Sequence, residues 1–132
     1  ISSLIKICKS LIMKYKINNK NIIGHSDIAP LRKNDPGEKF PWKKLADNKI
    51  GIWHNHKPGL LKKYRNIDIF EKKHKIQFVK NLNKIGYCFP TTKNFFIVKA
   101  LKAFQRHFRQ ELINGKLDKE CSKIAESLLK NS

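Results

Sequence analysis

Two side chains near the N-terminus have the types and the setting that metal-dependent chemistry requires. His25 follows a short apolar run, and Asp35 lies in a segment that is interrupted by several prolines and by Gly37. Imidazole and carboxylate groups are both common zinc ligands. Because proline restricts the backbone, this segment would hold the Asp35 carboxylate in place before a metal binds. The residue types therefore predict a partial zinc site at His25 and Asp35.

Each residue of this stretch also has an ordinary structural explanation. A lone histidine beside an apolar run is more often a core or surface histidine than a metal ligand. Residues 35–37 read Asp-Pro-Gly, which is typical of a turn whose aspartate accepts a local hydrogen bond. Lys33 alone would be a solvated surface charge. Taken one at a time, these residues favour structural roles.

The elements expected to position His25 are a helix followed by a strand. Apolar residues recur at helical spacing over residues 3–17, and Ser2 or Ser3 can cap that helix. The apolar run of residues 21–24 predicts a buried strand that ends at His25. Since functional groups gather where strands end, the order of helix, strand and loop predicts an α/β fold. A single strand needs partner strands, and no further strand is evident in the sequence.

The stretch from Gly24 to Trp42 reads G-H-S-D-I-A-P-L-R-K-N-D-P-G-E-K-F-P-W. It closely resembles the signature of zinc-dependent N-acetylmuramoyl-L-alanine amidases of the amidase-2 type. The branch that it resembles most carries an added C-terminal peptidoglycan-binding-like domain. The resemblance implies a bacterial hydrolase that degrades the cell wall by cutting the amide between N-acetylmuramic acid and the L-alanine of the stem peptide. Peptidoglycan or muropeptides would be its partners, in the cell envelope or periplasm.

The resemblance also implies roles for individual residues. His25 and Asp35 match two of the family's three zinc ligands, and Lys33 matches the lysine that helps to stabilise the oxyanion. The family's first zinc-binding histidine and its catalytic glutamate lie upstream, and no residue of this chain matches them. We therefore expect an incomplete Zn²⁺ site and a chain that is inactive alone. It would be the C-terminal piece of an amidase, or be complemented by a separate N-terminal half.

Three amphipathic helices are expected in the second half of the chain. Apolar residues keep helical spacing over residues 76–85 and again over 96–108, with a break at residues 90–92. Gly86 would end the first helix, and Asp118 would cap a third one. Short helices with aromatic residues at their contacts predict a small three-helix bundle.

Part of this second half resembles the peptidoglycan-binding-like domain that is appended to these amidases. The matching runs are A-F-Q-R-H-F-R at residues 103–109 and N-G-x-x-D at residues 114–118. Phe104 and Phe108 are one helical turn apart, which core packing explains. We expect the polar residues Gln105, Arg106 and Arg109 on a solvated face of this helix. The alternative is that they contact glycan or peptide carboxylates.

We therefore expect an α/β unit, made of a helix, a strand and a long active-site loop, followed by an all-α three-helix bundle. The boundaries are residues 1–58 for the C-terminal part of the catalytic domain, 59–68 for a linker and 69–132 for the peptidoglycan-binding-like domain. Trp42 is expected to be a core anchor in a short helix. His54 and His56 are expected to form a solvent-exposed pair, because the residues around them suggest a loop.

The chain of 132 residues has a formal net charge of +19. Such a charge attracts polyanions, including nucleic acid, anionic lipid and a carboxylate-bearing cell wall. The lysines are scattered rather than clustered, and only four arginines occur, so compositional drift explains the charge better than a specific partner. We expect no nucleic-acid partner. The alternative function is a non-catalytic basic binding module for cell wall or nucleic acid.

The remaining features of the sequence narrow the class of protein. Cys8, Cys88 and Cys121 are widely spaced and form no C-x-x-C motif, which argues against a disulfide framework or a thiolate zinc site. Hydrophobic residues make up 40% of the chain, but no apolar run reaches the roughly 18–20 residues of a membrane span. No signal peptide is visible. Because the chain begins with Ile1, we expect it to be the tail of a longer protein.

Overall fold

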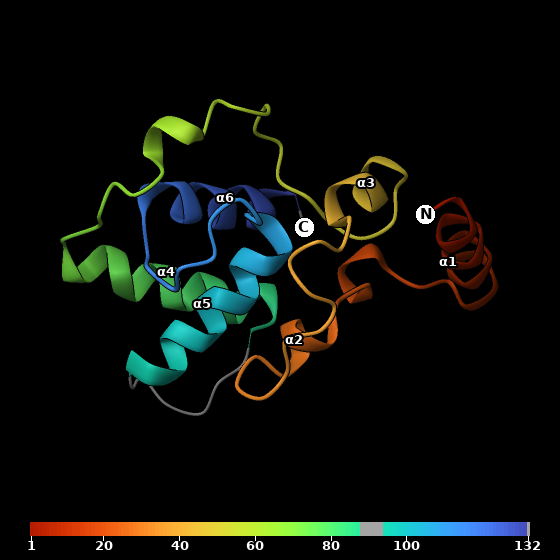
Figure 1. Ribbon diagram of the computed structural model, residues 1–132, viewed down its shortest axis with the longest axis horizontal. Helices are drawn as coiled ribbons and strands as arrows, with labels where there is room; N and C mark the ends of the chain where they lie inside the picture. Colours follow the sequence, from red (N-terminus) through yellow and green to blue (C-terminus); the bar gives the residue numbers. More distant parts are fainter. Residues whose placement is uncertain (88–93, 132) are drawn as a thin grey trace.

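The computed structural model describes residues 1–87 and 94–131, and these residues form helices joined by loops (Figure 1). The α-helices are α1 (Ser2–Tyr15), α2 (His25–Ile28), α3 (Trp42–Asp47), α4 (Lys72–Ile85), α5 (Asn94–Phe108) and α6 (Lys119–Lys130), and the 3₁₀ helices are η1 (Asn19–Asn21) and η2 (Lys62–Tyr64). Within the described ranges no β-strand occurs, and the only β-type pairing is an isolated bridge between Asp68 and Asp118. The predicted α/β fold is therefore wrong.

The strand expected at residues 21–24 fails for want of a neighbour. Asn21 ends η1, while Ile22 (φ −96°, ψ 97°) and Gly24 (φ −86°, ψ 164°) have extended backbones. An extended segment becomes a strand only when another strand pairs with it, and the described residues offer none. The Ile22 side chain instead packs against a small apolar cluster. His25 accordingly begins helix α2 instead of following a strand.

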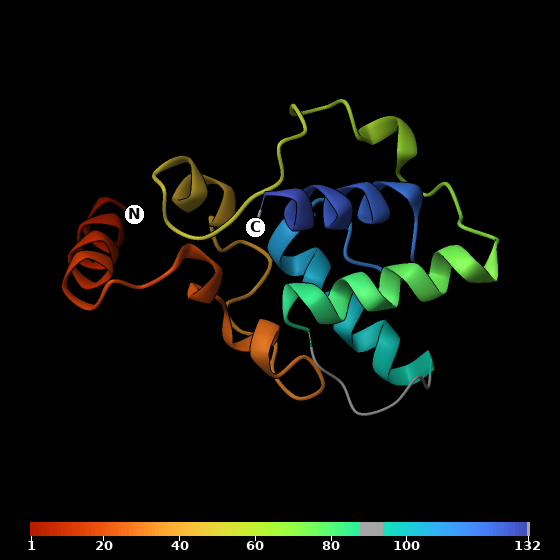
Figure 2. The same ribbon diagram turned by 180° about the vertical axis from the view of Figure 1, so that it is seen from behind.

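Helix α1 forms over nearly the predicted residues, although its expected cap is absent. Its N-cap position is Ile1, whose side chain cannot accept a hydrogen bond, and Ser2 and Ser3 both lie inside the helix. One face of α1 packs against a small core, which consists of Trp42, Leu45 and Ile50. Figures 1 and 2 both show α1 at the end of the molecule farthest from α4 and α6.

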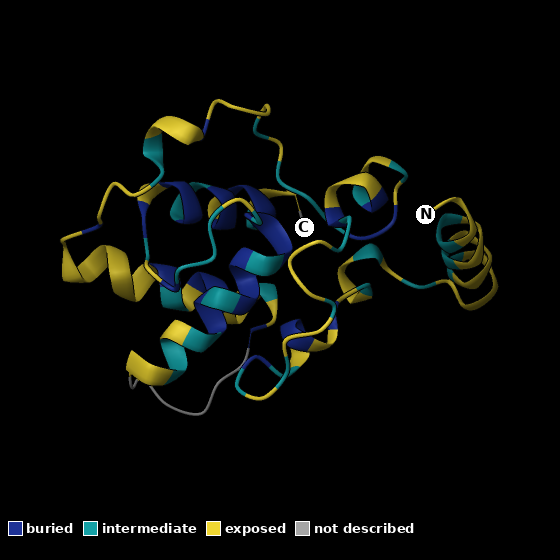
Figure 3. Ribbon diagram, in the orientation of Figure 1, coloured by how far each residue is buried: buried dark blue, intermediate teal, exposed yellow. Residues whose placement is uncertain are grey.

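Helices α4, α5 and α6 pack around the larger core of the molecule. Buried residues gather on α5 and α6, as the dark blue ribbon of Figure 3 shows. This core includes Phe78, Leu82, Leu101, Phe104, Phe108, Ile124 and Leu128. Gly86 ends α4 with φ 128°, a conformation that side chains resist. Asp118 caps α6 by accepting a hydrogen bond from the Cys121 amide at 2.9 Å. Both terminal residues are those that the sequence predicts.

Two sequence expectations fall outside the described residues, namely the helix break at residues 90–92 and the environment of Cys88. Of the other cysteines, Cys8 is half-buried and Cys121 is fully buried, and both are free thiols. Burial raises the pKa of the Cys121 thiol to about 12, so this thiol stays protonated. In the part of the chain that the structure describes, no helix is long and apolar enough to cross a membrane.

Candidate metal centre

The structure brings His25 and Asp35 together. The Nδ1 atom of His25 lies 3.2 Å from Oδ2 of Asp35. His25 is the first residue of helix α2, and Asp35 lies on the loop that follows this helix. Both side chains are open to solvent, with 43% and 66% of their surface exposed. A ligand or metal can therefore reach the pair from outside.

Backbone hydrogen bonds fold the loop back onto the start of α2. The amide of Ser26 donates to the carbonyl of Asp35 at 2.8 Å. Earlier in the loop, the amides of Arg32 and Lys33 both donate to the carbonyl of Ala29, at 3.2 and 3.0 Å. The loop that carries Asp35 is therefore fixed to the residue next to His25 by main-chain contacts.

Gly24 makes this close approach possible. A Cβ atom at this position would lie 2.6 Å from Cδ of Pro36 and 3.0 Å from Cζ2 of Trp42. The first distance is shorter than real Cβ contacts essentially ever are, and the second is tighter than most of them, so a larger residue would push the loop away. Trp42 is 5% exposed, which confirms it as a core anchor, and it forms one wall beside Gly24.

A buried carboxylate, that of Asp27, lies two residues after His25 in helix α2. Asp27 is 6% exposed, and its carboxylate accepts three hydrogen bonds. Its Oδ2 accepts from the Gly24 amide at 2.8 Å and from His107 Nδ1 at 2.7 Å, and its Oδ1 accepts from the Tyr87 hydroxyl at 2.6 Å. Burial, followed by the charge of Asp27, raises the pKa of Tyr87 well above its usual 10. The phenol therefore remains a donor over the working pH range.

The sequence does not predict these hydrogen bonds of Asp27. Asp27 stands within the motif at residues 24–42, but no spacing rule connects it with Tyr87 or with His107. The ring of His107 also stacks on Trp42, with 3.9 Å between centroids and 14° between planes.

His25 and Asp35 have a separation suited to a shared metal ion. Two donors on a tetrahedral zinc, each about 2.0–2.1 Å from the metal, lie about 3.3 Å apart, close to the 3.2 Å observed. Among the residues described, however, no group of three or more histidine, cysteine, aspartate or glutamate side chains could hold a metal. The imidazole of His25 and the carboxylate of Asp35 therefore fit zinc as two of its ligands.

Lys33 lies on the same loop between α2 and Asp35, and its side chain is half-exposed. Its amide is used in the loop's own hydrogen bonding, while its ammonium group has no hydrogen bond or ion pair to any described residue. An ammonium without a protein partner is available to an incoming anionic group.

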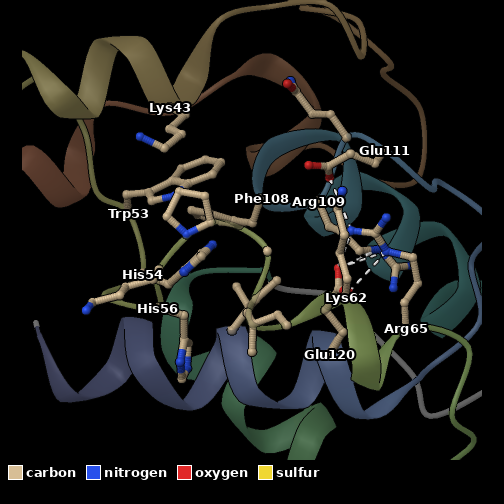
Figure 4. A pocket seen from close by; sticks show the side chains of 16 residues that line it. Lys43, Trp53, His54, His56, Lys62, Arg65, Phe108, Arg109, Glu111 and Glu120 are labelled. Atoms are coloured by element: carbon tan, nitrogen blue, oxygen red, sulfur yellow. Dashed lines mark hydrogen bonds and ion pairs between the residues drawn. The ribbon is translucent and has the colours of Figure 1, made fainter.

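His54 and His56 are half-buried, so they are not the solvent-exposed pair that the sequence predicts. Both lie beside a cavity of about 440 Å³, which Figure 4 shows from close by. Burial chiefly, with the neighbouring His56 and Lys43, lowers the pKa of His54 to about 4. His56 Nε2 lies 3.3 Å from the carbonyl of Lys123. The described residues supply no third metal ligand here.

Two residues expected on a solvated helix face are in fact buried. Gln105 is 0% exposed and Arg109 is 1% exposed, whereas Arg106 is half-exposed. The side-chain oxygen Oε1 of Gln105 accepts from the backbone amides of Asn114 and Gly115 at 3.0 and 2.9 Å. Both polar side chains thus hold the turn that precedes α6, which explains their burial without a glycan contact.

Arg109 anchors the same turn through charged and neutral partners. Its guanidinium forms an ion pair with Asp118 and donates to the carbonyl of Leu112 at 3.0 Å. The Glu120 carboxylate, 3.9 Å away, also pairs with Arg65 at 3.1 Å. These buried charges are mutually neutralised, as burial requires.

No family model matches the chain, but individual proteins do. It is 36% identical over 135 aligned residues to the N-acetylmuramoyl-L-alanine amidase AmiD of Escherichia coli strain K12, covering 98% of this chain and 47% of that protein. It is 49% identical over 42 residues to the 1,6-anhydro-N-acetylmuramyl-L-alanine amidase AmpD of Enterobacter cloacae, covering 32% of this chain and 22% of that one. The chain thus spans about half or less of the length of the curated relatives it matches.

Solved structures show the same relationship. The fold is similar to that of E. coli AmiD in complex with anhydro-N-acetylmuramic acid-L-Ala-D-γ-Glu-L-Lys, with a TM-score of 0.83 and 35% identity over 98% of this chain and 51% of that one. It is equally similar to AMPDH3 from Pseudomonas aeruginosa, with a TM-score of 0.83 and 32% identity over 98% of this chain and 52% of that one. The curated relatives of this chain, and its E. coli structural neighbour, are N-acetylmuramoyl-L-alanine amidases.

Proposed function

We propose that this chain carries part of the active site of a zinc-dependent N-acetylmuramoyl-L-alanine amidase of the amidase-2 type. The observation that supports it most is the 3.2 Å approach of His25 to Asp35 in a chain whose curated relatives are N-acetylmuramoyl-L-alanine amidases. The bond cleaved is the amide between the lactyl group of N-acetylmuramic acid and L-alanine. The substrate class is a muropeptide, since the similar AmiD structure holds one.

In this proposal each residue of the loop has one task. His25 and Asp35 would hold the zinc ion, and Lys33 would stabilise negative charge on the carbonyl oxygen as the amide is attacked. Zinc, when bound, would polarise that carbonyl and lower the pKa of a water toward neutrality. A third ligand and a general base would have to come from outside the described residues, because the pair at His25 and Asp35 has no further partner there. The chain alone would therefore not turn over substrate.

The second half of the chain would serve the same substrate. We propose that residues 69–132 form a peptidoglycan-binding-like domain and that residues 59–68 connect it to the amidase part at residues 1–58. The setting would be the bacterial cell envelope, where peptidoglycan lies. Helices α4 to α6 share one apolar core, to which Leu61 of the connecting segment also contributes.

The proposal is tested with a chimaera in which this chain replaces the matching half of E. coli AmiD. The rest of AmiD would then supply the groups that this chain lacks. We expect zinc-dependent release of the stem peptide from an anhydromuropeptide, followed by mass spectrometry. His25→Ala and Asp35→Ala should abolish this release. Removing one oxyanion-stabilising donor typically costs about 100-fold or more in rate, and Lys33→Met should do the same.

The matched control is Lys39→Met, which removes an exposed lysine from the same loop and should leave the rate unchanged. A chimaera that folds and binds zinc but releases no peptide would contradict the proposal. So would equal rates for the Lys33→Met and Lys39→Met variants.

A non-catalytic basic binding module is the second candidate, and the net charge of +19 is the observation in its favour. Binding to purified sacculi and to duplex DNA should be compared over a series of NaCl concentrations. Contacts to phosphates weaken steeply with salt. DNA binding that is tighter than sacculus binding and falls steeply with salt would favour this second candidate over the amidase.

A further inference from the structure

We propose that Tyr87 and His107, two residues of the second half of the chain, are positioning residues for the metal pair. Acting through Asp27, they would hold the Gly24 amide that precedes His25 and so help to fix the approach of His25 to Asp35. The proposal rests on the proposed function, because it assigns the pair to zinc. It also means that the helical bundle would contribute to the active site and not only to wall binding.

The first step of the argument is the burial of the network. Asp27, Tyr87 and His107 are 6%, 2% and 3% exposed. A carboxylate out of water is tolerated only when donors surround it. Asp27 has three such donors within 2.8 Å, and two of them come from Tyr87 and His107, which are distant in sequence. The position of Asp27 is therefore set by the second half of the chain.

The second step is the path from Asp27 to His25. The amide before His25, that of Gly24, donates to Asp27, and the amide after it, that of Ser26, donates to the Asp35 carbonyl at 2.8 Å. His25 is thus held between two main-chain anchors. One anchor depends on Asp27, and the other belongs to the loop that carries the partner carboxylate.

The third step is the second contact of His107. Its ring stacks on Trp42 at 3.9 Å between centroids, and Trp42 lies against Gly24. The Nε2 atom of His107 is buried and has no hydrogen-bond partner among the described residues. Its Nδ1 bond to Asp27 is therefore the ring's polar contact in the structure, and ring and carboxylate orient each other.

A merely structural role would predict that loss of these bonds lowers overall stability alone. The test must therefore separate a local from a global effect. Tyr87→Phe keeps the ring and removes the hydroxyl donor. His107→Phe keeps the stacking ring and removes the donor, whereas His107→Asn removes the ring and keeps a donor close to the position of Nδ1. Ile124→Val, in the bundle core away from Asp27, serves as a control that lowers global stability.

Two readouts apply to the 132-residue chain. One is the amide hydrogen-exchange rate of Ser26 relative to that of Leu101 in α5. The other is Zn²⁺ affinity, measured by competition with a chromogenic chelator. For Tyr87→Phe and His107→Phe we expect the relative exchange of Ser26 to rise about tenfold and Zn²⁺ affinity to fall about tenfold, within the range known for outer groups that orient ligands. His107→Asn should lie closer to the wild type in both.

The result that would overturn the proposal is a Ser26 exchange ratio that stays unchanged, or that changes only as it does in Ile124→Val. A His107→Asn variant as impaired as His107→Phe would overturn the role of the donor. If the wild-type chain binds no Zn²⁺, the assignment of the isolated pair to zinc fails, while the exchange ratios still decide whether the bundle positions His25.

Discussion

Arg109 offers the sharpest test of the structure of the bundle. The guanidinium is 1% exposed and pairs with Asp118, which caps helix α6. Replacing Arg109 with methionine keeps much of the apolar stem but takes the cation away from the Asp118 carboxylate, which keeps the backbone amides of Cys121 at 2.9 Å and Asn66 at 3.1 Å as donors. It also removes the cation that lies 3.9 Å from the buried Glu120.

The expected cost follows from these contacts. Breaking one partner of a buried ion pair costs about 3–5 kcal/mol, because the remaining charge is left without compensation. A domain has only about 5–15 kcal/mol of stability in total. For a chain of this length, 1 kcal/mol corresponds to roughly 3–5 °C, so Arg109→Met should lower the melting temperature by about 10–20 °C.

The assay is urea and thermal unfolding followed by circular dichroism. The matched control is Lys43→Met, which removes the same charge from an exposed pair with Asp47, whose side chains are 51% and 60% exposed. Exposed helical pairs contribute about 0.3–0.5 kcal/mol, so this variant should unfold within about 2 °C of the wild type. If both variants lost the same stability, our account of Arg109 as a buried anchor would be wrong.

Two further predictions concern Gly24 and His54. Gly24→Ala should destabilise the chain by about 1–3 kcal/mol, because its Cβ would lie 2.6 Å from Cδ of Pro36. Gly37→Ala, with no described atom within 4 Å of its Cβ, should change the free energy of unfolding by less than about 0.5 kcal/mol. Equal losses of stability in urea titrations of the two variants would contradict this explanation. His54 has a pKa of about 4 in the folded state, so the unfolded chain binds its proton first as the pH falls. Its contribution to stability is therefore complete above pH 6.5 and is lost toward pH 4, by about 1–2 kcal/mol after allowance for the half-exposed ring; His54→Phe should flatten that part of the pH profile, and an unchanged profile would refute the assignment.

Local patterns in the sequence were sufficient for most helices. The periodic apolar residues predicted α1 and the three helices of the bundle, and Gly86 and Asp118 end or begin the helices as their chemistry requires. These are interactions between neighbours in the chain. The motif at residues 24–42 likewise pointed to His25 and Asp35, which the structure places side by side.

Features that depend on distant residues could not be predicted in this way. The strand at residues 21–24 had the right composition, but strands require partners, and the described chain supplies none. The burial of Gln105 and Arg109 depends on a turn whose amides and carboxylate meet them. The link from Asp27 to Tyr87 and His107 joins opposite halves of the chain, and no local pattern encodes such a contact.

The claim that His25 and Asp35 share one metal ion is tested most directly by Zn²⁺ titration of the purified chain in a calorimeter. Weak binding of one ion per chain is expected for a site with two protein ligands, and both His25→Ala and Asp35→Ala should weaken it by at least about tenfold. Asp47→Ala, which removes an exposed carboxylate elsewhere, should leave it unchanged. Zn²⁺ binding that is the same in all four proteins would contradict the claim.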